Sequence, residues 1–233
     1  MTSPHRSAAR ATSPHWTIAQ AFMEWDPLVR IYESRLWRRS PLLTLLTGIS
    51  FDREYSLIAA ALQIDTAHRI LDLACGPGIY TRGFAQHRPE AAVVGMDLSA
   101  PMLRYAVRRA REARLANVAL VRGDALAFPF RANLFDGVNC CGALHLFPDV
   151  DEVLSEIRRV LREGGRLTIA AFRRGDSTFA RVRADLRRRL YGIDAFSPTG
   201  LRERLEGAGF SHVRCLHAAG VWLVISAETT KPA

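Results

Sequence analysis

The 233-residue sequence contains few cysteines and almost no lysine. Its four cysteines, Cys75, Cys140, Cys141 and Cys215, include no C-x-x-C pair, so neither a zinc site nor a disulfide framework is predicted. No apolar run approaches the roughly 20 residues that a membrane-spanning helix needs, and the N-terminus lacks the apolar segment typical of a secretory signal. We therefore expect a cytoplasmic protein without a transmembrane segment.

The basic side chains are nearly all arginine, because Lys231 is the single lysine among 32 basic residues. A net charge of +9 can indicate a nucleic-acid partner. However, the arginines fall mostly on predicted helix faces, as at Arg104, Arg108 and Arg111. This distribution favours a solvated surface over a patch for an anionic partner, so no nucleic-acid partner is expected.

Three segments differ in composition. Residues 1–15 are rich in Ser, Ala, Pro and Arg without an apolar period, which predicts disorder. Residues 16–62 carry apolar side chains at helical spacing, interrupted by Pro27 and Pro41, and Asp52 is expected to cap a helix that reaches about Leu62. We interpret residues 16–62 as a helical cap and residues 63–233 as one domain.

From residue 68 onward, predicted strands and helices alternate. Strands are expected at 69–73, 92–96, 118–122, 135–140 and 166–172, and helices at 79–86, 99–114, 149–161, 179–190 and 199–207. Gly164 and Gly165 are interpreted as the stop signal of the helix before them. The strands at 211–216 and 221–227 lie so close together that they predict an antiparallel hairpin. The pattern predicts an α/β fold with a doubly wound sheet, which binds ligands at the carboxyl ends of its strands.

A glycine-rich loop, DLACGPGIYT at residues 72–81, follows the first predicted strand. Gly76 and Gly78 permit a tight turn and close approach of a ligand to the main chain, and the helix behind them presents free N–H groups. A dinucleotide fingerprint would require a third glycine where Thr81 stands. A tight turn without any ligand is the alternative interpretation.

Acidic residues follow the next two predicted strands. Asp97 stands about 20 residues beyond the loop, where a carboxylate can accept hydrogen bonds from both hydroxyls of a ribose. Helix capping is the alternative for Asp97, but Ser99 fits that role. Asp124, after Gly123, is placed to accept a hydrogen bond from an adenine amino group. Thr81 and Asp124 together argue against an NAD dehydrogenase.

In this order and spacing the motifs resemble those of the class I S-adenosylmethionine (SAM)-dependent methyltransferases. The resemblance rests on D-x-A-x-G-x-G at 72–78, Asp97, G-D-A at 123–125, F-D-G-V at 135–138 and RVLREGGR at 159–166. It is greatest for the small-molecule branch that contains the ubiquinone/menaquinone C-methyltransferases, in which an alanine such as Ala74 commonly replaces the first loop glycine. It implies a Rossmann-like, seven-stranded sheet whose last strand is antiparallel, with SAM as cofactor and S-adenosylhomocysteine as product.

The resemblance also implies which residues bind the cofactor. The loop glycines would line its methionine part, Asp72 would orient its ammonium group, Asp97 would bind the ribose, and the fourth strand tip would face the sulfonium. The full set is Asp72, Ala74, Gly76, Gly78, Asp97, Leu98, Met102, Asp124, Ala125, Asn139 and Cys140.

Candidates for the chemical step are His145 and Tyr80, each either a base or acceptor contact or a structural residue. Trp25, Tyr32 and Trp37 of the expected cap, with His145, would bind the acceptor, or the three cap residues would only pack the cap. We expect biosynthetic O- or C-methylation of a hydrophobic quinone, phenol or polyketide by a monomer or homodimer without a metal. A non-methylating enzyme of the same fold, such as a cyclase, and a nucleic-acid methyltransferase remain alternatives.

Overall fold

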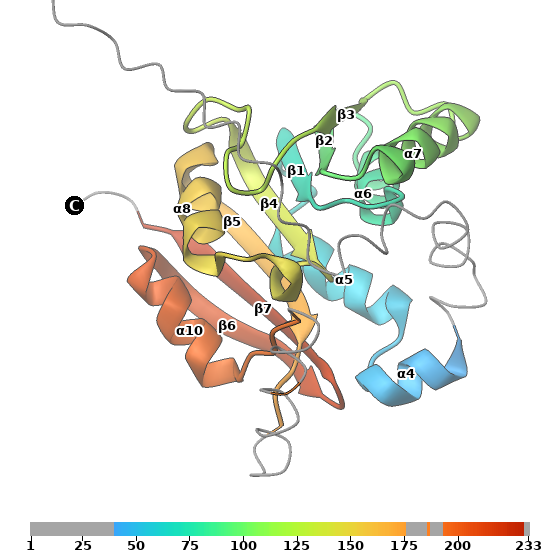
Figure 1. The fold of residues 1–233 in the computed structure, drawn as a ribbon. Helices are drawn as coiled ribbons and strands as arrows, with labels where there is room; N and C mark the ends of the chain where they lie inside the picture. Colours follow the sequence, from blue (N-terminus) through green and yellow to red (C-terminus); the bar gives the residue numbers. More distant parts are fainter. Residues whose placement is uncertain (1–39, 176–185, 187–192, 231–233) are drawn as a thin grey trace, which may run out of the picture.

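The computed structural model describes residues 40–175, 186 and 193–230 (Figure 1). Within these residues seven strands form one sheet in the order β3-β2-β1-β4-β5-β7-β6. The strands are β1 (Arg69–Leu73), β2 (Ala92–Asp97), β3 (Val118–Arg122), β4 (Phe135–Cys141), β5 (Leu161–Phe172), β6 (Phe210–Ala219) and β7 (Trp222–Thr229). The strand β7 runs antiparallel to both its neighbours, β5 and β6, and the other pairings of this sheet are parallel. The predicted doubly wound sheet with an antiparallel last strand is confirmed.

Helices cover both faces of this sheet (Figure 1). On one face lie α5 (Phe51–Ala61) and α6 (Ile79–His87), and on the other lie α8 (Val150–Val160) and α10 (Pro198–Gly207). The helix α7 (Ala100–Glu112) lies beside β2 and β3. Because successive strand residues point to opposite faces, Ile70 packs under α5 and α6 while Leu71 packs under α8. Burial on both faces explains the continuous apolar runs of the central strands.

Side-chain caps begin most of these helices. Ser99 and Ser197 accept hydrogen bonds from the third helical N–H of α7 and α10, and the cap at Ser99 agrees with the prediction. The prediction for α5 is wrong by two residues, because Ser50 caps this helix and Asp52 lies in its first turn. An acidic side chain at that position instead interacts favourably with the helix dipole.

The glycines at 164 and 165 do not end a helix. The preceding helix α8 already stops at Val160, because Leu161 has extended backbone angles. Both glycines lie inside β5, where Phe135 pairs with Leu161 but Gly137 pairs with Arg166. The chain between these pairings departs from the ladder, and Gly164 takes a φ of +67° there. The glycines therefore mark an irregularity in a strand, where we predicted a helix stop.

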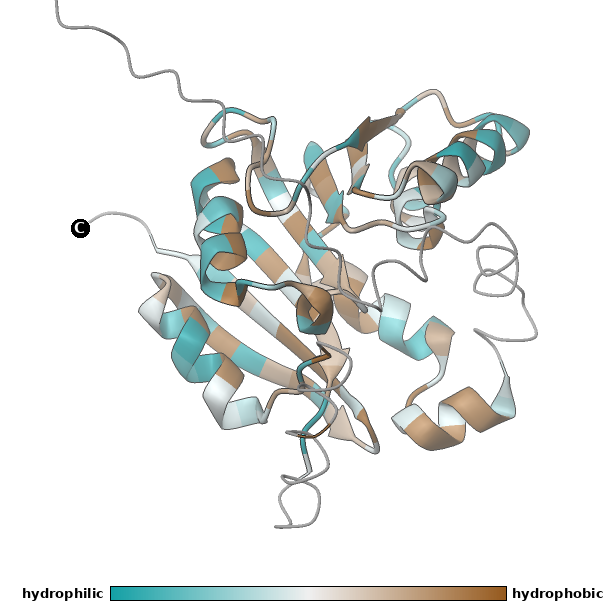
Figure 2. Ribbon diagram, in the orientation of Figure 1, coloured by the Kyte–Doolittle hydropathy of each residue, from teal (hydrophilic) through white to brown (hydrophobic). Residues whose placement is uncertain are grey.

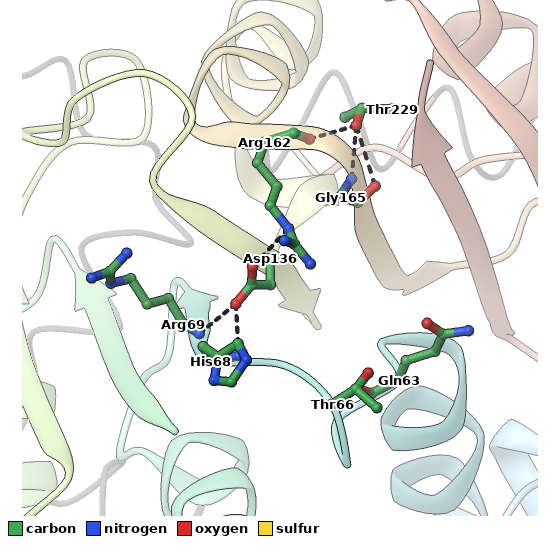
Figure 3. Close-up of polar contacts among 8 residues, drawn as sticks. All are labelled: Gln63, Thr66, His68, Arg69, Asp136, Arg162, Gly165 and Thr229. Atoms are coloured by element: carbon green, nitrogen blue, oxygen red, sulfur yellow. Dashed lines mark hydrogen bonds and ion pairs between the residues drawn. The ribbon is translucent and has the colours of Figure 1, made fainter. Parts of the chain in front are cut away.

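The amino edge of the sheet, where the parallel strands begin, is held by a polar network around Asp136 (Figure 3). Its Oδ2 accepts from the N–H groups of residues 68–69 at 2.7 Å each, and its Oδ1 lies 2.7 Å from the Nε of Arg162. The Thr229 hydroxyl donates to the Arg162 carbonyl at 2.7 Å and accepts from the Gly165 N–H at 2.9 Å. The network joins β1, β4, β5 and β7, which gives the F-D-G-V and RVLREGGR motifs a structural role.

The described part of the expected cap forms α4 (Pro41–Thr47) and α5. The helix α4 contacts the β6–β7 turn, where the Val221 N–H donates to the Leu46 carbonyl at 2.9 Å. Its outer side is apolar, as Figure 2 shows, and exposes Leu42, Leu45 and Leu46. No helix in the described ranges has the length and apolar character needed to cross a membrane.

Several predictions fall on residues outside this description. They are the disorder of residues 1–15, most of the cap with Trp25, Tyr32 and Trp37, and most of the helix expected at 179–190.

Candidate cofactor and acceptor site

The loop after β1 has a backbone of unusual handedness. Ala74, Gly76 and Gly78 take φ angles of +51°, +53° and +77°. These angles place the N-terminus of α6 directly at the end of β1, while the Cys75 N–H donates to the Met96 carbonyl of β2 at 3.0 Å. The loop is thereby fixed at the carboxyl edge of the sheet, where the parallel strands end.

The two loop glycines meet different surroundings. A Cβ at Gly76 would have no heavy atom within 4 Å, whereas a Cβ at Gly78 would lie 3.1 Å from the Cβ of Ala106. Gly78 therefore permits close packing of α6 against α7. The open space at Gly76 is the feature that a bound cofactor requires beside the main chain, so this loop fits the expected methionine part of SAM.

Asp97 connects the loop to the tip of β2. Its Oδ2 accepts from the Gly76 N–H at 2.7 Å and its Oδ1 accepts from the Ser99 N–H at 2.8 Å. The half-buried carboxylate is thus held beside the open side of Gly76. A carboxylate has about four acceptor positions, so this geometry is compatible with ribose hydroxyls as further donors. Ser99, through its own side chain, caps α7, as the sequence indicated.

Asp72 is buried behind the loop at the end of β1. It accepts hydrogen bonds from the Thr81 hydroxyl at 2.6 Å and from the Asn139 amide at 2.8 Å, and Asn139 in turn accepts from Thr168 at 3.0 Å. Burial raises the pKa of Asp72 to about 6, although both hydrogen bonds act to lower it. The carboxylate is therefore mainly ionised at pH 7 and supplies negative charge beneath the loop.

Thr81 shows why the dinucleotide fingerprint is incomplete. Its hydroxyl donates a hydrogen bond to the buried Asp72. A glycine at this position would leave Asp72 without that donor. Sequence reasoning recorded Thr81 only as a missing glycine and did not identify Thr168 at all. The partnership of Asp72 with Asn139 is visible only from the strand register, in which these two residues are paired.

Asn139 and Cys140 do not share a surface. As consecutive strand residues they point to opposite faces, so Asn139 reaches Asp72 while the Cys140 side chain lies in the apolar core under α8. Burial raises the pKa of the Cys140 thiol well above its usual value. Of this pair, only the Asn139 side chain lies on the face that carries Asp72.

The residues expected around the adenine gather at the tips of β2 and β3. Asp97 pairs with Arg122 across the two strands, and the Gly123 N–H donates to the Asp97 carbonyl at 3.1 Å. Asp124 is exposed, and its Oδ1 accepts from the Leu126 N–H at 2.9 Å. Leu98 and Ala125 are half-buried, whereas Met102 is buried.

Both candidates for the chemical step are buried and lie among aromatic rings on the α5 side of the sheet. His145, in the short helix η1 (Leu144–Leu146), has its ring centroid 4.2 Å from that of Phe172 and 6.5 Å from that of Trp222. Tyr80, in the first turn of α6, lies 5.5 Å from Phe51. The placement agrees equally with acceptor contact and with packing.

A buried carboxylate that the sequence did not reveal completes this region. Glu54 of α5 is 5% exposed, and its Oε1 accepts from the Trp222 Nε1 at 3.0 Å and from the Cys141 Sγ at 3.3 Å. The available signal was its position in α5, three residues after Phe51 and four before Ile58, on the face that packs against the sheet.

Comparison with known proteins agrees with this geometry. A family model described as a methyltransferase domain matches residues 70–165. The demethylmenaquinone methyltransferase of Thermus thermophilus is 39% identical over 140 residues, which are 60% of this chain and 63% of the relative. The chain thus aligns with less than two thirds of that relative's length.

Two solved structures share the fold at low sequence identity. Phosphoethanolamine N-methyltransferase 2 of Haemonchus contortus, solved with SAM, superposes with a TM-score of 0.70 and 18% identity over 89% of this chain and 58% of its own. The [4+2]-cyclase SpnF superposes with a TM-score of 0.67 and 20% identity over 78% of this chain and 81% of its own. Residues 70–165 thus match a methyltransferase domain, and the whole fold is similar to that of these two structures.

Proposed function

We propose that this protein transfers the methyl group of SAM to an oxygen or carbon of a hydrophobic, quinone-like small molecule. The observation that carries the proposal is the Asp97 carboxylate, held by the Gly76 N–H beside open space at the carboxyl edge of the sheet. The name of the Thermus relative supports the choice of a quinone-like acceptor.

In this proposal two acidic side chains hold the cofactor. Asp97 accepts from the ribose hydroxyls, and the ionised Asp72 attracts the positively charged end of the molecule from beneath the loop. The remaining contacts come from Ala74, Gly76, Gly78, Leu98, Met102, Asp124, Ala125, Asn139 and the backbone of Cys140. SAM itself supplies a methyl group activated by a sulfonium, so the protein has mainly to align an acceptor with it.

The acceptor would lie among the rings on the α5 side. His145 and Tyr80 are the residues we propose to contact it, with Trp25, Tyr32 and Trp37 contributed by a cap of residues 16–62 over a domain of residues 63–233. We further propose a cytoplasmic monomer or homodimer that acts without nucleic acid, because the arginine side chains are spread over several helices.

The test is a calorimetric titration of SAM, and separately of NADH, into the wild type and Asp97→Ala. We expect micromolar SAM affinity that the substitution weakens at least tenfold, because a charged hydrogen-bond acceptor is lost. Asp65→Ala, which removes an exposed carboxylate paired with His87, is the control and should bind SAM like the wild type.

The proposal is wrong if NADH binds and SAM does not, or if Asp97→Ala binds SAM as tightly as the wild type. The second step is turnover with a reduced naphthoquinone lacking the ring methyl group, with S-adenosylhomocysteine detected by mass spectrometry.

A further inference from the structure

Glu54 is a carboxylate in an unusual position. It is 5% exposed, and in the described part of the chain no arginine or histidine forms an ion pair with it. Its two hydrogen bonds, from Trp222 and Cys141, both end on Oε1, and no described residue donates to Oε2. Among the described residues, Oε2 is not one of the fully buried side-chain atoms that lack a partner, so its acceptor positions are open to a donor from a ligand.

The two donors to Glu54 lie at the carboxyl edge of the sheet. Cys141 is the last residue of β4, and Trp222 is the first residue of the antiparallel β7, so both lie at this edge. Cys141 also follows Asn139 by two residues, on the same face of β4 and about 7 Å further along the strand. Glu54 therefore lies on the face and at the edge where Asp72 and Asn139 are expected to meet the charged end of the cofactor.

The surroundings of Glu54 are aromatic. The Trp222 ring, which donates to it, packs edge-on against Phe172, with ring centroids 5.7 Å apart, and lies 6.5 Å from His145. Phe51, one turn earlier in α5, packs against Tyr80. A small number of polar groups among aromatic side chains is typical of sites that bind apolar ligands and orient them through a few hydrogen bonds.

We propose that Glu54 is a specificity-determining residue of the acceptor site, and that its Oε2 accepts a hydrogen bond from a hydroxyl group on an aromatic acceptor. The proposal rests on the proposed function, because it concerns the acceptor of the same methyl transfer. A carboxylate favours a ligand O–H and disfavours an ether or carbonyl oxygen in the same position, since those oxygens can only accept.

If Glu54 has a purely structural role and only fastens α5 to the sheet, Glu54→Gln should bind hydroxyl and ether ligands in the same ratio as the wild type. In Glu54→Gln the amide oxygen can still accept from Trp222 and Cys141, so the fastening is retained. The amide NH₂ then replaces Oε2, and it donates to a hydroxyl oxygen and an ether oxygen alike. Discrimination between these two groups is therefore lost only if Oε2 binds the acceptor.

The experiment compares 1-naphthol with 1-methoxynaphthalene by calorimetric titration into the full chain, with and without S-adenosylhomocysteine. We expect the wild type to bind 1-naphthol about ten- to a hundredfold more tightly than the ether, which is the range for one hydrogen bond to a charged group. Glu54→Gln should reduce the ratio to about twofold, with a thermal midpoint and a SAM affinity close to those of the wild type.

Two variants serve as controls. Glu228→Gln removes a carboxylate at the far end of β7 and should keep the wild-type ratio. Trp222→Phe keeps the Glu54 carboxylate while removing one donor, and should keep the ratio within about threefold. A wild-type ratio below about twofold overturns the proposal, as does an unchanged ratio in a folded Glu54→Gln. Should that variant not fold, the wild-type ratio decides alone, and a value below about twofold overturns the proposal.

Because binding is measured without turnover, the proposed function can fail separately. Suppose that the wild type shows the expected ratio but forms no S-adenosylhomocysteine from SAM and a quinol. This result contradicts the proposed methyl transfer but leaves the proposed recognition of a hydroxyl group by Glu54 standing. The reverse result, turnover without discrimination, contradicts the assignment of Glu54 alone.

Discussion

Asp72 is enclosed by β1, β4 and α6, and its hydrogen-bond partners Thr81 and Asn139 are both uncharged side chains. Its pKa of about 6 exceeds the value of 3.8 that it would have in an unfolded chain. Between these two values the folded protein binds more protons than the unfolded one, so the free energy of unfolding falls as the pH rises from about 4 to about 6.

Asp72→Asn should remove this pH dependence. Relative to the variant, the wild type is expected to lose up to about 3 kcal/mol of stability between pH 4 and pH 7, since each pKa unit corresponds to about 1.4 kcal/mol. Urea unfolding of both proteins at several pH values measures the difference. Parallel curves for the two proteins would show that Asp72 has an ordinary pKa.

His145 lies beside Phe172 and Trp222, and its proposed role is contact with the acceptor. His145→Phe preserves an aromatic ring and removes the polar atoms. We expect kcat/KM for a reduced naphthoquinone to fall at least tenfold, as for loss of a base or a polar contact, with SAM affinity within twofold. Equal kcat/KM in both proteins would assign His145 a packing role.

At the scale of elements, the two glycines of the loop between β1 and α6 have different roles. Gly76 leaves room for a ligand, and Gly78 lets α6 pack closely against α7. Gly76→Ala would place a methyl group in the open space expected to hold the cofactor, whereas Gly78→Ala would push against Ala106 of α7. Both positions have positive φ, so each substitution costs about 1–2 kcal/mol in backbone strain.

Gly76→Ala should therefore weaken SAM binding at least tenfold with a modest decrease in thermal midpoint. Gly78→Ala should show the larger decrease in thermal midpoint. Calorimetry and thermal unfolding of the two variants measure these effects side by side. The opposite ranking in both measurements would mean that the cofactor approaches Gly78 and not Gly76.

Sequence patterns predicted the strands and helices of this sheet because those patterns are local. The glycine loop, Asp97 and the Ser99 cap were also predictable, since each depends on residues within a few positions of a strand end. The bonds from Trp222 to Glu54 and from Asn139 to Asp72 were not, because they join residues 168 and 67 positions apart. The irregularity at Gly164 and Gly165 was also missed, since glycine after a helix pattern more often ends the helix.

At the scale of the whole molecule, the Asp136 network joins the strands where the parallel strands begin, and the candidate site lies where they end. Asp136→Asn should leave one or more of the donors at residues 68–69 and Arg162 poorly satisfied, which costs about 1–3 kcal/mol. SAM affinity should stay within twofold, because the network lies at the amino edge. Urea unfolding and calorimetry measure the two quantities.

Arg162→Ala is the matched control for this substitution. It removes a half-exposed partner of the same carboxylate and should cost less than about 1 kcal/mol. A loss of SAM affinity in Asp136→Asn that matches its loss of stability would show that the two edges of the sheet are not independent.

The position of β7 bears on how this chain folds as it leaves the ribosome. The strands β1 to β5 can pair in the order in which they are synthesised, but β6 has β7 as its partner in the sheet and β7 comes after it. While β6 emerges it therefore has no strand to pair with. During the same time, the side of β5 that will pair with β7 has free backbone N–H and C=O groups. The β5 edge is closed only when β7 has been made, and until then it can pair with a strand of another chain.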